Sequence, residues 1–571
     1  MTEITLESDN PVFDVIVLGS GVGGMAAALF AAIRGLSVVV VEKAAVVGGT
    51  SALSAGTAWI PGTLHAAAVN PADSREHAER YVRAAVGNRL DPRKLDAFLT
   101  NGPAAIAELQ AQTEVVFRPR PHHPDYMSDL PGATLCGRAL EPVPFDGRKL
   151  GRDIGRLRPP LSVLTVFGMM AGADEIKHLL LAGRSVQSTI YAIKLFARYG
   201  SDRLRYRRGT RLLMGNALCG RFLYSLNRRG IPIWTGAVAR ELVVDGNRVA
   251  GVVLQRDGRT TRVLARRGIV LATGGFAHSK RLQALLLPEP VARHTAMPDE
   301  VSGDGIELGL AQGGTLDNSY ADGAFWSPIS LHRKANGAVS VYPHFFLDRG
   351  KPGVLAVNRA GRRFVNEATS YDGFVRAMYE ANARSPSIPC YLIADARAVR
   401  DYGFGLVLPG GRRARRLIAD GYLKRADSLG DLARLLGVDP DALPKTVARF
   451  NAQARAGHDS DFHRGETAAN LVLGDPKHKP NPCLGPLESL PYYGLELHPG
   501  MNGTSIGLVT DDQGQVLDGN DTPIPGLYAC GNDMASIMAG SYPGPGVTIG
   551  PAITFAFIVA NALKTTPLCA R

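Results

Sequence analysis

A glycine- and proline-rich segment near the C-terminus, Gly540–Pro551, contains residue types that could bind a substrate. It holds four glycines, three prolines and one tyrosine, Tyr542, and an apolar run over 552–560 follows it. A stiff loop that leads into a helix leaves backbone N–H groups free to donate hydrogen bonds. Those groups and the Tyr542 hydroxyl could hold a carbonyl oxygen. The alternative is a simple turn before a buried helix.

Residues 13–42 predict the strand–helix–strand unit of a dinucleotide-binding domain. A buried strand runs directly into Gly19-Ser20-Gly21-Val22-Gly23-Gly24, which is a G-x-G-x-x-G motif. We expect Gly19 to make the tight turn, Gly21 to admit the pyrophosphate, and Gly24 to let the helix pack on the strand. Glu42, at the end of the second strand, can accept hydrogen bonds from ribose hydroxyls. An acid there disfavours a 2′-phosphate, so the ligand is predicted to be FAD- or NAD-like.

Three further segments favour FAD over NAD. A loop of small residues over 48–57 follows the acid and could run along a pyrophosphate and ribityl chain. Residues 268–276 predict a strand that ends in an Ala-Thr-Gly-Gly turn, and residues 526–533 predict a late strand that ends in Gly-Asn. Four dispersed pieces in this order indicate a flavoprotein.

The bulk composition fits a large protein with two or more domains. The chain has 571 residues, of which 45% are apolar, and no window is long and apolar enough to span a membrane. The acidic N-terminus lacks a signal-peptide pattern. Six scattered cysteines predict a reducing compartment without disulfides or zinc. The net charge of +12 permits anionic lipid or nucleic acid as a partner, but requires neither.

Four motifs together resemble the 3-ketosteroid Δ1-dehydrogenases, within the flavoprotein superfamily of fumarate reductase and succinate dehydrogenase. They are GSGxGGMxAA, GGTSxxSxGTxWIP, NRxGRRFVNE and SYPGPGVTIGP. The resemblance covers nearly the whole chain and implies an α/β fold: a Rossmann-like FAD-binding domain (GR2-type flavoprotein) interrupted by an α+β substrate or catalytic cap domain. We place the FAD domain at 1–325 and 496–571, an insertion at 165–212, and the catalytic domain at 326–495.

The resemblance implies FAD-dependent 1,2-desaturation of ring A of a 3-ketosteroid, in steroid catabolism. Hydride would leave C1 for the flavin, and Tyr371, just after the Asn-Glu of the third motif, would take the proton from C2. The Tyr542 hydroxyl and the Gly546 N–H would hold the C3 oxygen. Tyr126 would stabilise a tyrosinate at Tyr371 by a hydrogen bond. Ser128-Asp129 stands where the family usually has Pro-Glu, which weakens the assignment of Tyr126.

The same resemblance, with the glycine motifs, assigns the residues that contact FAD. They are Gly19, Gly21, Gly24, Glu42, Lys43, Gly49, Thr50, Ser51, Ser54, Ala55, Gly56, Thr57, Ala237, Val238, Gly274, Gly275, Asp304, Gly531, Asn532, Val547, Thr548 and Ile549.

Several elements are predicted from local pattern alone. Residues 231–238 read as a strand, residues 243–254 as a hairpin and residues 391–395 as a strand. In the third motif, Arg363-Phe364-Val365 reads as a strand, and residues 429–436 read as a helix. The adjacent His122 and His123 are expected to be solvated loop residues rather than metal ligands.

Other activities stay open. A 3-ketosteroid Δ4-(5α)-dehydrogenase would use the same machinery with the steroid shifted. A fumarate- or urocanate-type reductase needs cations for a carboxylate, but Trp326-Ser327-Pro328 stands where its His-Pro-Thr turn would be, and the C-terminal loop has no arginine. A flavin-containing electron carrier would not need the three tyrosines. A nucleic-acid-modifying flavoprotein is disfavoured because no RNA-binding module is present.

Residues 178–211 raise the question of membrane contact. On a helical projection Val186, Ile190, Ile193 and Ala197 fall together, opposite Arg184, Ser188, Lys194 and Arg198, and an arginine cluster follows. Such a helix can lie on an anionic membrane, or it can pack on the protein as a surface helix. The protein is expected in the cytoplasm, with association at the inner face of the cell membrane as one alternative, and with a quinone or other compound as electron acceptor.

Overall fold

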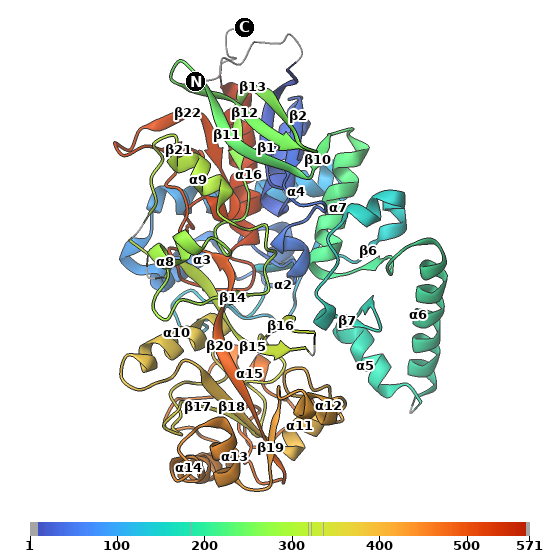
Figure 1. Cartoon of the computed structure of the whole chain (residues 1–571), viewed down its shortest axis with the longest axis vertical. Coiled ribbons are helices and arrows are strands. Elements are labelled where there is room, and N and C mark those ends of the chain that lie inside the picture. The colour runs from blue at the N-terminus through green and yellow to red at the C-terminus, as the bar shows by residue number, and fades with distance from the viewer. Residues whose placement is uncertain (1–9, 184, 318, 321, 335, 567–571) are drawn as a thin grey trace.

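The computed structural model describes residues 10–183, 185–317, 319–320, 322–334 and 336–566. Arg184, Cys569 and the acidic N-terminal residues 1–9 lie outside this range. Figure 1 shows two sheets, one above the other, with helices packed around both and a pair of helices standing off one side. Within the described part of the chain, no helix combines the length and the apolar character needed to cross a membrane.

Helices and strands are interspersed along the chain. The α-helices are α1 (Val22–Ile33), α2 (Leu64–Val69), α3 (Arg75–Val86), α4 (Pro92–Gln112), α5 (Ala173–Leu181), α6 (Val186–Arg205), α7 (Met214–Arg228), α8 (Lys280–Leu286), α9 (Asp304–Leu310), α10 (Tyr371–Asn382), α11 (Ala396–Tyr402), α12 (Ala414–Ala419), α13 (Leu429–Leu436), α14 (Ala442–Ala456), α15 (Ala468–Leu473) and α16 (Ile549–Thr565).

The strands are β1 (Val12–Leu18), β2 (Val38–Glu42), β3 (Ala58–Trp59), β4 (Phe117–Pro119), β5 (Ala139–Pro142), β6 (Phe145–Asp146), β7 (Thr165–Val166), β8 (Met169–Met170), β9 (Arg211–Leu212), β10 (Ile233–Thr235), β11 (Ala237–Asp245), β12 (Arg248–Arg256), β13 (Arg259–Leu271), β14 (His294–Thr295), β15 (Ala324–Arg333), β16 (Val339–Pro343), β17 (Val354–Val357), β18 (Cys390–Asp395), β19 (Lys424–Ala426), β20 (Tyr492–Thr504), β21 (Gln515–Leu517) and β22 (Pro523–Ala529).

The first sheet is the expected dinucleotide-binding sheet. Its order is β10-β2-β1-β13-β12-β11, and β22 pairs with the C-terminal end of β13, from Ile269 to Leu271. β10, β2, β1, β13 and β22 run parallel, with Val15 beside Val38 on one side and Gly268 on the other. Strands buried on both faces need continuous apolar runs, which is the pattern of β1 and β2. The β11–β12 hairpin predicted over 243–254 is confirmed.

The second sheet lies below the first in Figure 1 and has the order β16-β15-β20-β18-β17, with β14 and β19 paired to β20. The predicted strand at 391–395 and helix at 429–436 correspond to β18 and α13. The long strand β20 pairs with β18 near Tyr492 and with β15 near Thr504. The sheet therefore draws on residues 294–504, a span wider than the predicted catalytic domain.

Two strand predictions were wrong. The segment 231–238 is not one strand, because Gly236, at φ +68°, separates β10 from β11. Residues 363–365 form neither helix nor strand. Here the polar side chains determine the backbone: Arg363 forms buried ion pairs with Glu367 at 2.7 Å and Asp459 at 2.8 Å.

α16 joins the C-terminal loop to the first sheet. It packs against α1 and α4, and Ile553, Phe555, Val559 and Ala560 on it are fully buried or nearly so. Small side chains on α1, such as Ala26 and Ala28, let the two helices approach closely. The N-terminal ends of both helices therefore lie near the same edge of the sheet, where β1 ends.

The predicted insertion forms a helical pair, α5 and α6, at the side of the molecule (Figure 1). α6 packs on α5 through a face that includes Ser188 and Ala192, and His178 contacts Ser188 at 3.1 Å. The predicted apolar face exists, but it points to solvent: Val186 is 79% and Ile193 62% exposed. Ser188, which the projection places opposite the apolar residues, is buried because this side of α6 packs on α5.

Candidate active site

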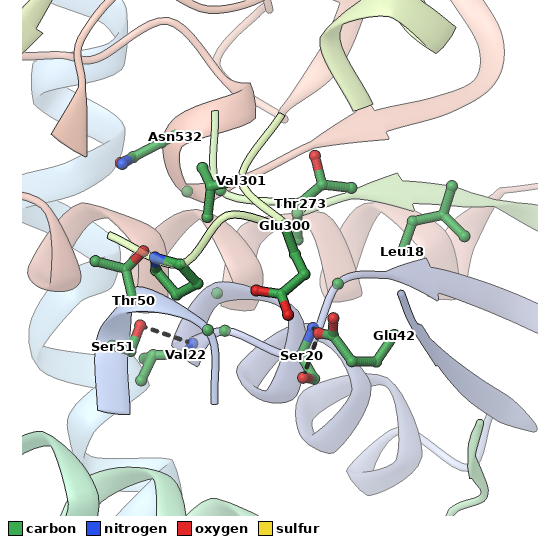
Figure 2. A pocket seen from close by; sticks show the side chains of 18 of the residues that line it. Leu18, Ser20, Val22, Glu42, Thr50, Ser51, Thr273, Glu300, Val301 and Asn532 are labelled. Atoms are coloured by element: carbon green, nitrogen blue, oxygen red, sulfur yellow. Dashed lines mark hydrogen bonds between the residues drawn. The ribbon is translucent and has the colours of Figure 1, made fainter. Parts of the chain in front are cut away.

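A pocket opens where the N-terminal ends of α1 and α16 meet the carboxyl ends of β1, β2 and β13 (Figure 2). Gly19, Gly21 and Gly23 form one wall, and Thr548, Ile549 and Ala552 of α16 line it as well. Helix N-termini carry unpaired N–H groups and partial positive charge, which favour an anion such as a pyrophosphate. The placement matches what a dinucleotide requires.

The polar groups of this pocket suit FAD. Glu42 accepts from the Ser20 N–H at 3.0 Å and the Ser20 hydroxyl at 2.5 Å, so its carboxylate is held at the pocket wall (Figure 2). Ser51 accepts from the Val22 N–H at 3.1 Å. The buried Thr50 hydroxyl has no hydrogen-bond partner among the described residues, although it lines the pocket. Such a group is satisfied when a polar ligand binds beside it.

The glycines at the pocket leave space or prevent clashes. A Cβ on Gly19 would lie 2.2 Å from the Ala272 oxygen, and one on Gly24 would lie 2.1 Å from the Gly19 oxygen. A Cβ on Gly21 would meet only the Ser51 hydroxyl, at 3.7 Å, so this glycine faces open space. The three glycines thus divide into two packing positions and one at the ligand surface, as the motif predicts.

Most of the residues assigned to FAD line the pocket. They are Gly19, Gly21, Glu42, Lys43, Gly49, Thr50, Ser51, Ser54, Ala237, Gly274, Asp304, Gly531, Asn532, Thr548 and Ile549. Seven other residues assigned to FAD do not line the pocket: Gly24, Ala55, Gly56, Thr57, Val238, Gly275 and Val547. Val238 points away because side chains alternate along β11, where Ala237 and Ala239 face the pocket.

The three predicted tyrosines meet although they lie in three distant segments. The ring centroids of Tyr126 and Tyr371 are 5.5 Å apart, those of Tyr126 and Tyr542 6.0 Å, and those of Tyr371 and Tyr542 5.3 Å. The Tyr126 hydroxyl lies 3.4 Å from the Tyr371 hydroxyl, which is a long hydrogen bond. We call these three residues the tyrosine cluster.

The loop that carries Tyr542 is fixed to the loop that carries Tyr126. The Pro543 oxygen accepts from the Tyr126 N–H at 2.8 Å and from the Tyr81 hydroxyl at 2.5 Å. The Ser541 hydroxyl donates to the Ala85 oxygen at 3.0 Å. These contacts hold the tyrosines without using their hydroxyl groups.

Tyr371 is the first residue of α10, and its helix is tied to the same loop. Ser370 caps the helix by accepting from the Gly373 N–H at 3.0 Å. The buried Asp372 accepts from the Trp326 N–H at 2.9 Å and the Arg376 guanidinium at 2.8 Å. Arg376 also donates to the Gly540 oxygen. One arginine thus links the helix of Tyr371 to the loop of Tyr542.

Gly546 is suited to the predicted oxyanion role. It has φ +91°, and a Cβ there would lie 2.3 Å from the Thr57 oxygen, so only glycine fits. Within the described part of the chain, its N–H has no hydrogen-bond acceptor. An unpaired backbone donor in the same loop as the Tyr542 hydroxyl is suited to stabilising a developing oxyanion.

Burial governs the acidity of the tyrosine cluster. It raises the pKa of Tyr542 to about 12, and it raises the pKa values of Tyr126 and Tyr371 further. The sequence did not identify Arg349, a buried cation whose charge lowers the pKa of Tyr126 in opposition to burial. The guanidinium donates to four backbone oxygens, including those of His344 and Phe345.

Aromatic rings extend from the tyrosine cluster. Phe345 and Phe346 lie 5.2 and 5.8 Å from Tyr371, and Phe325 lies 5.2 Å from Tyr542. His123 lies beside Tyr126 and is only 8% exposed, whereas its neighbour His122 is exposed. The prediction that His123 is solvated was therefore wrong, because its loop folds inward toward Tyr126.

Other pocket residues had no distinctive sequence signal. They include Arg158, Pro298, Glu300 and Asn502. Arg158 pairs with Glu300 at 3.0 Å, and Figure 2 shows the Glu300 side chain pointing into the pocket. They come from loops outside the glycine motifs, and only the folded chain brings them to the pocket.

Comparisons with known proteins agree with this geometry. The family profile described as FAD binding domain matches residues 14–549. The chain is 38% identical, over 95% of its length and 92% of the other's, to 4-oxocyclohex-2-ene-1-carboxylate 5-dehydrogenase of Sinomonas cyclohexanicum. It is 37% identical, over 96% and 97%, to 3-oxosteroid 1-dehydrogenase of Mycobacterium tuberculosis.

The fold also matches a solved steroid complex. The crystal structure of 3-ketosteroid Δ1-dehydrogenase from Sterolibacterium denitrificans, bound to 1,4-androstadiene-3,17-dione, has a TM-score of 0.90 and 37% identity. The match covers 97% of this chain and 99% of the other.

Proposed function

Since the chain belongs to the FAD binding domain family and, within it, to the 3-ketosteroid Δ1-dehydrogenases, we propose that it desaturates ring A of a 3-ketosteroid between C1 and C2. It is an FAD-dependent oxidoreductase. The observation that carries the substrate chemistry is the convergence of Tyr126, Tyr371 and Tyr542, together with the Gly546 N–H on the loop of Tyr542, which has no acceptor among the described residues. An electron carrier without substrate chemistry has no need of that arrangement.

The first task of the site is to make a C2 hydrogen acidic. The Tyr542 hydroxyl and the Gly546 N–H donate to the C3 oxygen and stabilise the negative charge that develops there. Because both donors belong to one loop of fixed geometry, they are aligned before the substrate binds.

The second task is to accept the proton. Tyr371 takes it from C2, and Tyr126, whose hydroxyl lies 3.4 Å away, donates a hydrogen bond to the resulting tyrosinate. Bound FAD supplies the hydride acceptor for the hydrogen that leaves C1. The rings of Phe325, Phe345 and Phe346 exclude water from the reacting carbons, which keeps the hydrogen bonds to the oxygen strong.

Anaerobic flavin reduction tests this proposal. The purified yellow protein should bleach with androst-4-ene-3,17-dione, and product analysis should find a new C1–C2 double bond. Δ4-(5α) desaturation would instead appear as bleaching by 5α-androstane-3,17-dione with a new C4–C5 double bond. A flavin that stays oxidised with every 3-ketosteroid would overturn the proposal.

A second candidate substrate is a 4-oxocyclohexane or -cyclohexene carboxylate. The observation in its favour is the 38% identity to a dehydrogenase named for such a compound. The chemistry beside the ketone would be the same, so the tyrosine cluster serves both. The apolar rings around Tyr371 favour the steroid, since Arg349, a cation behind them, is already bound to backbone oxygens. Bleaching by 4-oxocyclohexanecarboxylate but by no steroid would favour the carboxylate.

We also propose that α6 attaches the protein to an anionic membrane surface. Val186, Ile190 and Ile193 are 79%, 49% and 62% exposed, and Leu204 is 88% exposed. The exposed cations Lys194, Arg203, Arg205 and Arg207 accompany them. Apolar side chains that insert, with cations that meet lipid phosphates, are the two parts of an interfacial helix. Such attachment would favour an apolar substrate and a membrane quinone as electron acceptor.

Vesicle sedimentation tests the membrane proposal. The wild-type protein should sediment with phosphatidylglycerol vesicles and much less with phosphatidylcholine vesicles. The double variant Ile190→Glu, Ile193→Glu should lose this binding. Leu435→Glu, at a position that is 54% exposed on α13, is the matched control and should bind as wild type does. Unchanged sedimentation of the double variant would discard the membrane role.

A further inference from the structure

His123 completes a closed ring of aromatic contacts at the active site. Its ring centroid lies 6.2 Å from that of Tyr126 and 6.3 Å from that of Phe346. Tyr126 and Phe346 in turn lie 5.5 and 5.8 Å from Tyr371. His123 therefore contacts two rings, Tyr126 and Phe346, and each of these contacts the proposed base Tyr371.

His123 is also the member of this ring with an unused buried polar atom. Its Nε2 is buried and has no hydrogen-bond partner within the described part of the chain. Burial, together with the positive charge of Arg120, lowers the pKa of His123 to about 3, so the imidazole is neutral at neutral pH. A neutral imidazole carries one N–H donor. A buried donor or acceptor without a partner costs about 1–3 kcal/mol, so an unpartnered Nε2 calls for an explanation in either tautomer.

We propose that His123 is a specificity-determining residue whose Nε2–H donates a hydrogen bond to an oxygen that the substrate carries away from its reacting ketone. The inference rests on the proposed function, because it places the ketone at Tyr542 and Gly546. The Tyr126 ring contacts both Tyr542 and His123, at centroid distances of 6.0 and 6.2 Å, so His123 lies next to the group that binds the reacting ketone without belonging to it.

Both candidate substrates carry such an acceptor. A 3,17-diketosteroid has a second ketone at C17, and a 4-oxocyclohexanecarboxylate has a carboxylate opposite its ketone. The shared chemistry is an acceptor oxygen remote from the reacting carbonyl. A site that donates to such an oxygen rejects an analogue without it, since the donor is then left buried and unpaired.

Paired substrates measure this contact. One pair is androst-4-ene-3,17-dione and androst-4-en-3-one, which lacks the C17 oxygen; the other is 4-oxocyclohexanecarboxylate and cyclohexanone. For each pair, the ratio of kcat/KM values for anaerobic flavin reduction is compared between wild type and His123→Phe. The ratio should fall about tenfold for the pair whose oxygen His123 binds, since one neutral hydrogen bond is lost. The substrate pair whose ratio falls shows whether His123 binds the C17 ketone of a steroid or the carboxylate of an oxocyclohexane.

Two further variants make the outcome decisive. His123→Gln keeps an N–H donor and should restore part of the ratio. If His123→Phe fails to retain FAD, the apolar variant His123→Leu replaces it. His122→Phe, at the exposed neighbour, should behave as wild type. If His123→Phe, or His123→Leu in its place, changes every substrate equally or none, the inference fails. If no substrate bleaches the wild-type flavin, the proposed function itself fails.

Discussion

Within the described part of the chain, two buried clusters of polar side chains differ in how far their hydrogen-bonding capacity is used. In the tyrosine cluster, the hydrogen bond between the Tyr126 and Tyr371 hydroxyls is long, at 3.4 Å, and the Gly546 N–H on the loop of Tyr542 has no acceptor among the described residues. The other, the serine–histidine–aspartate cluster, consists of Ser330, His344 and Asp348.

The serine–histidine–aspartate cluster has the side chains of a hydrolytic triad. Ser330 Oγ lies 2.7 Å from His344 Nε2, and His344 Nδ1 lies 2.6 Å from Asp348 Oδ2. The Tyr422 hydroxyl also bonds to Ser330 at 2.7 Å, and the Gly405 N–H donates to Asp348 at 3.1 Å. All three members are at most 2% exposed. Nothing in the cluster is left to bind a substrate.

The comparison of the two clusters shows that residue types alone do not identify a reactive site. A triad needs an accessible nucleophile and free donors for an oxyanion, and the serine–histidine–aspartate cluster has neither. Its role is to hold the loop after β16, which presents Phe345 and Phe346 to Tyr371. We therefore interpret the saturated cluster as structural and keep the tyrosine cluster as the proposed reactive site.

Replacing the proposed base should have the largest effect. Tyr371→Phe should lower the rate of flavin reduction by about 10²–10⁴-fold, because the proton acceptor is lost, while FAD and steroid binding persist. Stopped-flow absorbance under anaerobic conditions measures the rate, and spectral titration measures binding. Tyr379→Phe, on the same helix, is the control and should stay near wild type. Full activity of Tyr371→Phe would remove it from the base role.

Loss of one oxyanion donor should come next. Tyr542→Phe should lower kcat by on the order of 10²–10³-fold, because the hydroxyl acts on charge that develops in the transition state. The KM should change far less than kcat, which steady-state kinetics with an artificial electron acceptor can resolve. A loss that appears only in KM would mean that Tyr542 merely binds the steroid.

A substitution in the serine–histidine–aspartate cluster should lower stability rather than the rate of flavin reduction. Ser330→Ala leaves His344 Nε2 and the Tyr422 hydroxyl unpaired, and it should lower the free energy of unfolding by about 1–3 kcal/mol. Urea denaturation followed by fluorescence measures this, with the exposed Ser460→Ala as control. The rate of flavin reduction in the folded variant should stay close to that of wild type. A loss of activity as large as that of Tyr371→Phe would contradict the comparison.

The smallest expected effect is the contribution of Asp348 to the pH dependence of stability. Burial raises the pKa of Asp348, but His344, the Gly405 N–H and Arg349 outweigh it, so the pKa lies below its ordinary value. The unfolded chain therefore binds the proton more readily, and ionised Asp348 stabilises the fold above about pH 4. This contribution should fade as the pH falls further, and Asp348→Asn should show a shallower acid limb in urea denaturation. Parallel acid limbs would exclude Asp348 as a source of acid sensitivity.

Much of the FAD-binding sheet could be predicted from sequence, because its signals are local. The strands β1 and β2, the turn at Gly19–Gly24 and Glu42 follow one another in the chain, and each glycine has a backbone reason. Prediction failed at residues 363–365, where Arg363 holds the backbone through ion pairs with Glu367 and the distant Asp459. It also failed at His123, whose loop could only be placed once its contacts with Tyr126 and Phe346 were known.

The sequence by itself determined the glycine turn, the acid at the end of β2, the loop 540–551 and, through resemblance, the identities of the three tyrosines. Only the tertiary structure decided which hydroxyls are free and which are saturated. It also decided that the apolar face of α6 points to solvent and that His123 is buried with an unused nitrogen. The physical reason is that backbone conformation follows from neighbouring residues, whereas burial and hydrogen-bond satisfaction depend on segments hundreds of residues apart.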